Sequence, residues 1–261
     1  MAQAQYVFFI GTGRMGSTFL ADYIGRNHPG CLAEHQPNRM IKILSNRFVS
    51  RKTQAEKMRD YLRSWRDRRQ ALLDARKLDV YVQSDSWLFG FTPWLEEVFG
   101  MPYVIHVVRH PLTYIPSQLN RFYREAWSGL MRNLIPYWRL RGDLTGDFTR
   151  GEWKKANEEI KTAWNWVKIN QFIDENRKGI AHFLRIRSED MFSPDRDGLK
   201  QIIDFCGFPV DPDIAEEPTR DTDRNFSVNK FPSAGEWPEK TTQAVVEICR
   251  PMMGVLGYRD F

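Results

Sequence analysis

The sequence predicts an α/β fold in which helices flank a parallel sheet, as a single domain over residues 1–261. Residues 6–10 form a continuous apolar run, which is typical of a buried parallel strand, and residues 103–108, apolar except for His106, form the strongest strand candidate of the chain. Segments with the helical spacing of apolar residues alternate with strand candidates, which is typical of parallel sheets. A glycine-rich turn follows the first run, and such sheets bind ligands at the carboxyl ends of their strands.

The first elements follow from local signals. Residues 6–10 form a strand, and residues 17–26 form a helix with apolar side chains on one face. Asn-His-Pro-Gly at 27–30 ends that helix. Residues 28–33 make a poor strand, so we expect Glu34 in the turn after the first helix.

The later elements rest on the same kinds of signal: helical or strand periodicity, bounded by Gly and Pro. In chain order we expect a helix over 53–78, strands over 80–83 and 103–108 with a helix over 93–99 between them, a helix over 113–127, a loop-rich segment over 128–152, one long helix over 152–176, a strand over 182–186, a helix over 198–206, an irregular loop over 209–238 and a last helix over 241–256.

Composition narrows the function classes. A net charge of +5 and a pI near 9.1 favour anionic ligands, of which a phosphorylated small molecule and nucleic acid are two. Cys31, Cys206 and Cys249 are widely spaced, without disulfide or metal-ligand spacing, so a reducing compartment and no metal are expected. The apolar run at 6–10 is too short for a signal peptide or an anchor, so we expect a soluble, cytoplasmic protein with no membrane partner.

The turn over residues 11–18 is the first candidate site. Backbone N–H groups between a strand and a helix N-terminus form an anion site. The turn can be read as G-x-G-x-x-G, with Glu34 near the place of a ribose-binding acid, which points to an NAD(P)-dependent oxidoreductase. As a nucleoside triphosphate loop it lacks the lysine, because that position holds Ser17, and it carries a cation inside the turn instead, Arg14.

A second candidate site begins where the strand over 103–108 ends. Arg109 follows that strand directly, and Ser117 lies eight residues further on, early in the next helix. A guanidinium and a hydroxyl at a helix start suit a phosphate dianion.

Together these motifs resemble those of sulfotransferases that use 3′-phosphoadenosine 5′-phosphosulfate (PAPS), whose fold is P-loop NTPase-like. Gly-x-x-Arg-x-Gly-Ser-Thr resembles their 5′-phosphosulfate loop, and Arg109 with Ser117 resembles their 3′-phosphate motif. Weaker similarities at Trp164, 187–209 and 251–258 extend the resemblance over most of the chain. The chain resembles the tyrosyl-protein, carbohydrate and bacterial branch of this family more than the cytosolic aryl branch. The resemblance implies that the donor is held by Gly11, Gly13, Arg14, Met15, Gly16, Ser17, Thr18, Arg109, Ser117 and Lys230.

The resemblance also has departures and open choices. Many relatives carry a lysine where this chain has Ser84, and an adenine-side tyrosine where it has Ser188. The proton acceptor for transfer is expected to be Glu34, 20 residues after Arg14, as in relatives with a carboxylate there. His35, adjacent and with the better ordinary pKa for a base, and Asp85, at a strand end, are the alternatives.

The sequence therefore predicts a sulfotransferase that moves a sulfuryl group from PAPS to a hydroxyl or amine of a small-molecule or carbohydrate acceptor, releasing the desulfated product PAP without a metal. A nicotinamide-dependent oxidoreductase and a non-catalytic nucleotide- or nucleic-acid-binding protein remain the alternatives, although no nucleic-acid partner is expected. The sequence does not identify the acceptor or the oligomeric state.

Overall fold

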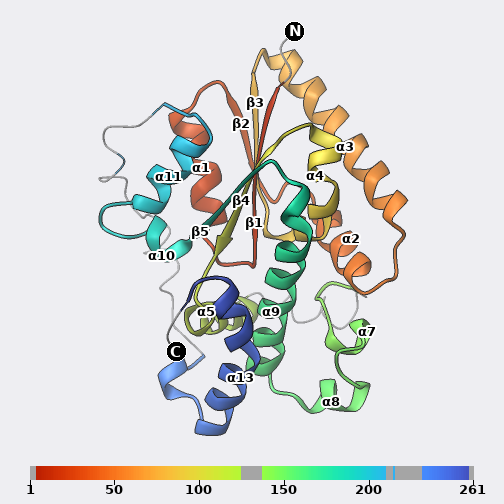
Figure 1. The fold of residues 1–261 in the computed structure, drawn as a ribbon, viewed down its shortest axis with the longest axis vertical. Helices are drawn as coiled ribbons and strands as arrows, with labels where there is room; N and C mark the ends of the chain where they lie inside the picture. The colour runs from red at the N-terminus through yellow and green to blue at the C-terminus, as the bar shows by residue number, and fades with distance from the viewer. Residues whose placement is uncertain (1–3, 125–136, 210–213, 215–230, 259–261) are drawn as a thin grey trace.

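The computed structural model describes residues 4–124, 137–209, 214 and 231–258. Its centre is a five-stranded sheet in which every neighbouring pair is parallel, in the order β2-β3-β1-β4-β5 (Figure 1). The strands are β1 (Gln5–Gly11), β2 (Cys31–His35), β3 (Val80–Ser84), β4 (Tyr103–Val108) and β5 (His182–Arg187). Because all five run the same way, their carboxyl ends meet at one edge, as the sequence predicts.

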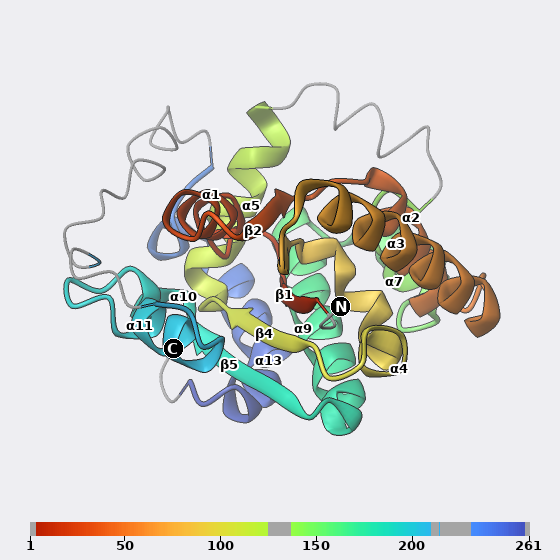
Figure 2. The same cartoon turned by 90° about the horizontal axis from the view of Figure 1, so that it is seen from above.

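Helices cover both faces of the sheet (Figure 2). One face carries α1 (Ser17–Asn27), α10 (Ser188–Met191) and α11 (Asp197–Phe205), which pack on Val7 and Phe9 of β1. The opposite face packs on Phe8 and Ile10 of the same strand. That face carries α2 (Arg39–Val49), α3 (Ala55–Arg76), the 3-10 segment η1 (Ser86–Trp94), α4 (Leu95–Phe99) and α9 (Glu158–Asn176).

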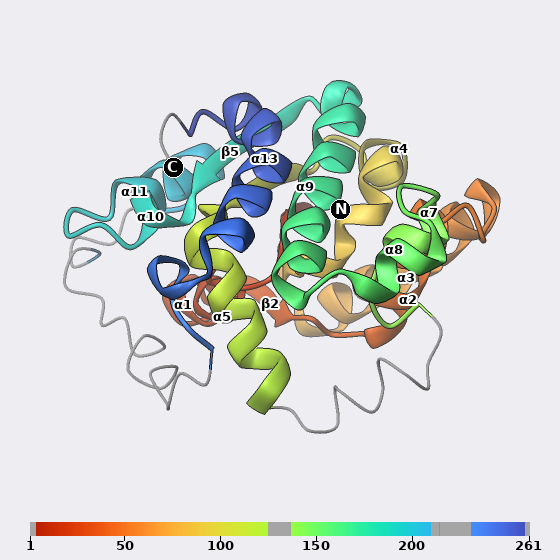
Figure 3. The ribbon, with the colours of Figure 1, turned by 90° about the horizontal axis from the view of Figure 1, so that it is seen from below.

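A third apolar cluster lies beyond the carboxyl edge, where α5 (Pro111–Arg124), α9 and α13 (Glu239–Val255) lie together (Figure 3). Ile115, Trp166 and Cys249 are fully buried there. This cluster fixes α5, and with it Ser117, against the end of β4. The short elements of the fold are α7 (Gly142–Thr145), α8 (Arg150–Lys155), η2 (Arg177–Gly179) and η3 (Ala234–Glu236).

One expectation from the sequence is wrong in a way that matters for the site. The segment before Glu34 is not a turn but the edge strand β2, paired in parallel with β3 so that Glu34 lies opposite Gln83 and His35 opposite Ser84. All five residues of β2 are only half-buried. An edge strand needs no continuous apolar run, because its pairing with a neighbour distant in sequence holds it.

Other boundaries also differ from those expected. The segment over Arg39–Val49 forms α2, which begins where the Asn38 side chain accepts a hydrogen bond from the Met40 N–H (2.9 Å). The expected single helix over 152–176 is two helices, because Asn157 caps a new start by accepting from the Ile160 N–H (2.9 Å). No helix in the described ranges is both long and apolar enough to cross a membrane.

Candidate functional site

The turn between β1 and α1 has a backbone that glycine makes possible. Gly11 has φ 153° and Gly16 has φ 88°, and a Cβ at Gly11 would lie 2.3 Å from the Val107 carbonyl oxygen. Gly16 is also the N-cap of α1, and no side chain caps that end. The first N–H groups of α1 therefore have no side-chain acceptor and can bind an anion placed in the turn.

The loop and the second motif are in direct contact. The Arg14 Nε donates to the Ser117 Oγ (2.9 Å), and the Arg109 Nη1 donates to the Arg14 carbonyl oxygen (2.9 Å). Arg14 itself has a left-handed backbone, φ 63°, which turns its carbonyl toward Arg109. Residues more than 90 positions apart thus form one cationic site at the carboxyl ends of β1 and β4.

Arg109 is held rigidly and has no ion-pair partner among the described residues. Its Nε donates to the Thr113 Oγ1 (3.2 Å), and its carbonyl accepts from the Trp166 Nε1 (2.9 Å). Burial lowers the pKa of the Arg109 guanidinium, and the charge of Glu189 raises it less. A half-buried cation of this kind gains more from a bound anion than a fully solvated one does.

His35 contacts the first turn of α1. Its Nε2 lies 3.0 Å from the Ser17 Oγ and 3.5 Å from the Thr18 Oγ1. Ser17 is buried and Thr18 is exposed. The structure therefore brings together three of the residues that the sequence assigns to the site, at the end of β2.

Glu34 lies in a different environment. The Arg69 Nε makes an ion pair with its Oε2 (2.7 Å), and the Tyr81 hydroxyl donates to the same oxygen (2.7 Å). The Glu34 side chain is 26% exposed and that of Arg69 is 12% exposed. Because successive residues of a strand point to opposite faces, Glu34 points to the α3 side and His35 to the α1 side.

Asp85 is a buried carboxyl at the end of β3. It accepts from the Trp87 N–H (2.8 Å) and from the Gln83 Nε2 (3.1 Å) and caps η1. Burial raises its pKa to about 7, against the lowering effect of these two hydrogen bonds. Asp85 has no exposed surface, and its two hydrogen bonds fix the start of η1, which carries Ser86.

Three polar side chains around Gly13 were not predicted from the sequence. Gln36 follows β2 with φ 44°, and its Nε2 donates to the Ser86 Oγ (3.2 Å). A Cβ at Gly13 would lie 3.2 Å from the Gln118 Oε1 and 4.0 Å from the Ser86 Oγ. That Gln118 oxygen is buried without a hydrogen-bond partner in the described part of the chain. Of the three, only Gln118 could have been found from the sequence, because it directly follows the predicted site residue Ser117 on α5.

Two predicted donor-binding residues, Met15 and Lys230, and the departure at Ser84 remain to be placed. The Met15 side chain is fully buried in the apolar cluster beneath α1, so only its backbone faces the turn. Lys230 lies outside the described residues. Ser84, where relatives carry lysine, has a buried hydroxyl that no described group binds.

The order of the strands bears on the dinucleotide interpretation. In that fold the second strand lies beside the first, and its acid reaches the ribose. Here β3 and β4 flank β1, and β2 is the edge strand. Glu34 is paired with Arg69. The topology thus argues against a nicotinamide cofactor bound across the Gly11–Gly16 turn in the usual way.

Comparisons with known proteins give the fold. No protein-family model and no curated protein sequence matches this chain. Among solved structures, it is similar to the sulfotransferase domain from the curacin biosynthetic pathway, with 15% identity and a TM-score of 0.51 over 95% of this chain and 98% of that one. It is also similar to the sulfotransferase domain of the Synechococcus PCC 7002 olefin synthase, with 15% identity and a TM-score of 0.54 over 100% and 97%. The chain therefore has the α/β fold of these two sulfotransferase domains.

Proposed function

We propose that this protein is a sulfotransferase that moves a sulfuryl group from PAPS to a hydroxyl or amine of a small-molecule or carbohydrate acceptor. The observation that carries the proposal is the contact between two anion motifs, Arg14 to Ser117 and Arg109 to the Arg14 carbonyl. A nucleotide with phosphates on both the 3′ and the 5′ oxygen of its ribose has two anionic groups, which two such motifs at one sheet edge can bind. The fold shared with two sulfotransferase domains agrees with this proposal.

Different residues of the site bind different groups of PAPS. The uncapped N-terminus of α1, with Ser17 and Thr18, binds the 5′-phosphate. Arg109 and Ser117 bind the 3′-phosphate. The Arg14 guanidinium, now bonded to Ser117, holds the oxygen that bridges phosphorus and sulfur, where negative charge develops as the bond breaks.

In the transfer step one bond to sulfur forms and one breaks. The acceptor oxygen or nitrogen bonds to sulfur, the bond between sulfur and the bridging oxygen breaks, and PAP leaves with that electron pair. The acceptor proton passes to a base. We propose His35 for this role, because its ring lies against the α1 turn, whereas Glu34 is engaged by Arg69 and Tyr81. No step needs a metal.

Ligand stabilisation tests the proposal. A ligand at about 100 times its Kd stabilises the folded state by about 2.7 kcal/mol, which raises the melting temperature of a chain of this size by roughly 5–10 °C. We expect this shift with PAP and none with NAD or a short DNA duplex. A shift with NAD and none with PAP would contradict the proposal.

A further inference from the structure

A hollow of about 410 Å³ lies where α2 ends and α3 begins. Basic side chains dominate its lining, and no carboxylate contributes to it; the cations are Arg47, Arg51, Lys52 and Lys57. All four are exposed. Four positive charges around one hollow raise the local positive potential, which favours an anion there.

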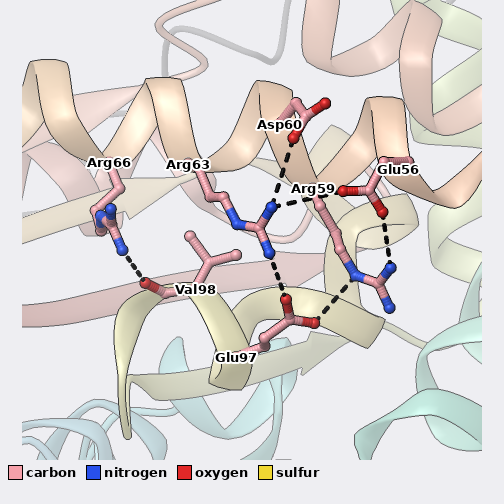
Figure 4. A network of polar contacts seen from close by, with 7 residues as sticks. All are labelled: Glu56, Arg59, Asp60, Arg63, Arg66, Glu97 and Val98. Atoms are coloured by element: carbon pink, nitrogen blue, oxygen red, sulfur yellow. Dashed lines mark hydrogen bonds and ion pairs between the residues drawn. The ribbon is translucent and has the colours of Figure 1, made fainter.

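The carboxylates nearby are already engaged. Glu56 pairs with Arg59 (3.1 Å) and Arg63 (3.6 Å), and Glu97 pairs with the same two arginines (3.1 and 3.0 Å), as Figure 4 shows. In the part of the chain that the structure describes, no carboxylate lies within ion-pair distance of Lys57 or of the other lining cations. One set of cations on this side of the molecule is thus neutralised by protein and the other is not.

The backbone at the end of α2, where two of these cations lie, is strained at Arg51. Arg51 has φ 55°, a left-handed conformation that costs a residue with a side chain roughly 1–2 kcal/mol and that glycine usually occupies at a helix end. The Lys52 N–H donates to the Arg47 carbonyl (2.8 Å) and closes this end. The Arg47 guanidinium lies 5.6 Å from the centre of the Tyr137 ring, which holds it beside the hollow.

The start of α3 adds to the same potential. Thr53 and Gln54 line the hollow, and Gln54 is the N-cap of this 22-residue helix without a side-chain hydrogen bond to it. The helix dipole therefore favours negative charge at this point, where the first turn holds one carboxylate, Glu56, which pairs with Arg59 and Arg63.

We propose that this hollow binds a phosphate monoester. Four cations and a helix N-terminus balance a compact dianion better than they balance a single carboxylate. The cations converge on one hollow rather than following a groove, which fits a terminal phosphate and not a nucleic-acid backbone. The lining cations begin at Arg47, eight residues after the start of α2, so at about 1.5 Å per residue they lie roughly 12 Å along the helix from the end that follows β2. The inference therefore does not depend on the proposed function.

Backbone amide shifts of the full chain, titrated with glycerol 3-phosphate, test the site locally. In the wild type we expect saturable shifts at residues 53–57. The double variant Arg51→Gly/Lys57→Gln should weaken binding by about tenfold or more, as the loss of two charge-assisted contacts predicts. The matched control Arg68→Gln/Arg76→Gln removes two exposed charges further along α3 without releasing a carboxylate, and it should leave the affinity within about twofold.

The variants also separate binding from folding. Arg51→Gly relieves the left-handed strain, so it should keep or raise the melting temperature while it lowers affinity. Shifts confined to residues 11–18, equal weakening in both double variants, or displacement of glycerol 3-phosphate from residues 53–57 by duplex DNA would each overturn the proposal.

A vesicle co-sedimentation experiment distinguishes a lipid phosphate from a soluble phosphate ester. Co-sedimentation of the wild type, but not of Arg51→Gly/Lys57→Gln, with phosphatidylcholine vesicles that contain phosphatidic acid assigns the site to a lipid headgroup. Binding of glycerol 3-phosphate without co-sedimentation assigns it to a soluble phosphate ester. The phosphate site stands in both cases.

Discussion

Neighbouring residues of β2 have different partners, and this decides their proposed roles. His35 contacts Ser17 at 3.0 Å, whereas Glu34 pairs with Arg69 at 2.7 Å across the other face of the sheet. The sequence shows both side chains beside the first helix but cannot show a partner 35 positions away. The expectation that Glu34 is the base rests on the resemblance to relatives with a carboxylate at this place, and the alternation of the strand moves our proposal to His35.

Substitutions at these two positions give separable results. His35→Asn should lower kcat by about 10²–10⁴ with little change in PAP affinity, the usual scale for loss of a general base. Glu34→Gln should instead lower the melting temperature, because it leaves Arg69 half-buried without its carboxylate. Steady-state kinetics and thermal unfolding on both variants check this. The roles are reversed if Glu34→Gln abolishes turnover at an unchanged melting temperature while His35→Asn stays active.

Among the elements, the buried and strongly patterned ones were predictable. The strands β1 and β4 consist mostly of apolar residues, and α1 has a periodic apolar face, so each lies close to its predicted position. The strand β2 and the helix α2 were not predicted. Each is held by a neighbour remote in the sequence, β3 for β2 and η1 for α2, and local pattern does not report such contacts.

The crossing of α2 and η1 depends on Gly90. A Cβ there would lie 2.6 Å from the Ser45 Cα, a backbone atom that cannot rotate away. Gly90→Ala should therefore force α2 outward and destabilise the fold by about 1–3 kcal/mol, the cost of overpacking. Urea unfolding measures this, with Gly30→Ala as the control, since nothing lies within 4 Å of its Cβ position. Equal stability of the two variants would show that α2 is not packed as described.

At the scale of the molecule, strand order explains why the two anion motifs meet. The sheet places β1 between β3 and β4, so the turn after β1 lies beside Arg109 after β4. Each motif was predictable from its own residues, as a turn and as a strand end. Their contact, Arg109 to the Arg14 carbonyl, was not, because the sequence predicts a parallel sheet without fixing which strands are neighbours.

The affinity for PAP, measured by titration calorimetry on the wild type, Arg109→Ala and Arg14→Ala, tests most directly whether the two motifs hold one donor. Arg26→Ala, which removes an exposed cation paired with Asp22 on α1, serves as the control. PAP keeps the 3′-phosphate, so Arg109→Ala should weaken its binding by roughly 10–100-fold. This is the loss of affinity expected when one hydrogen bond between charged groups is removed. Arg14→Ala should change PAP affinity less and lower turnover more, because PAP has lost the sulfuryl group that Arg14 serves. An affinity in Arg109→Ala equal to that of the Arg26→Ala control would show that Arg109 does not bind the 3′-phosphate of the donor.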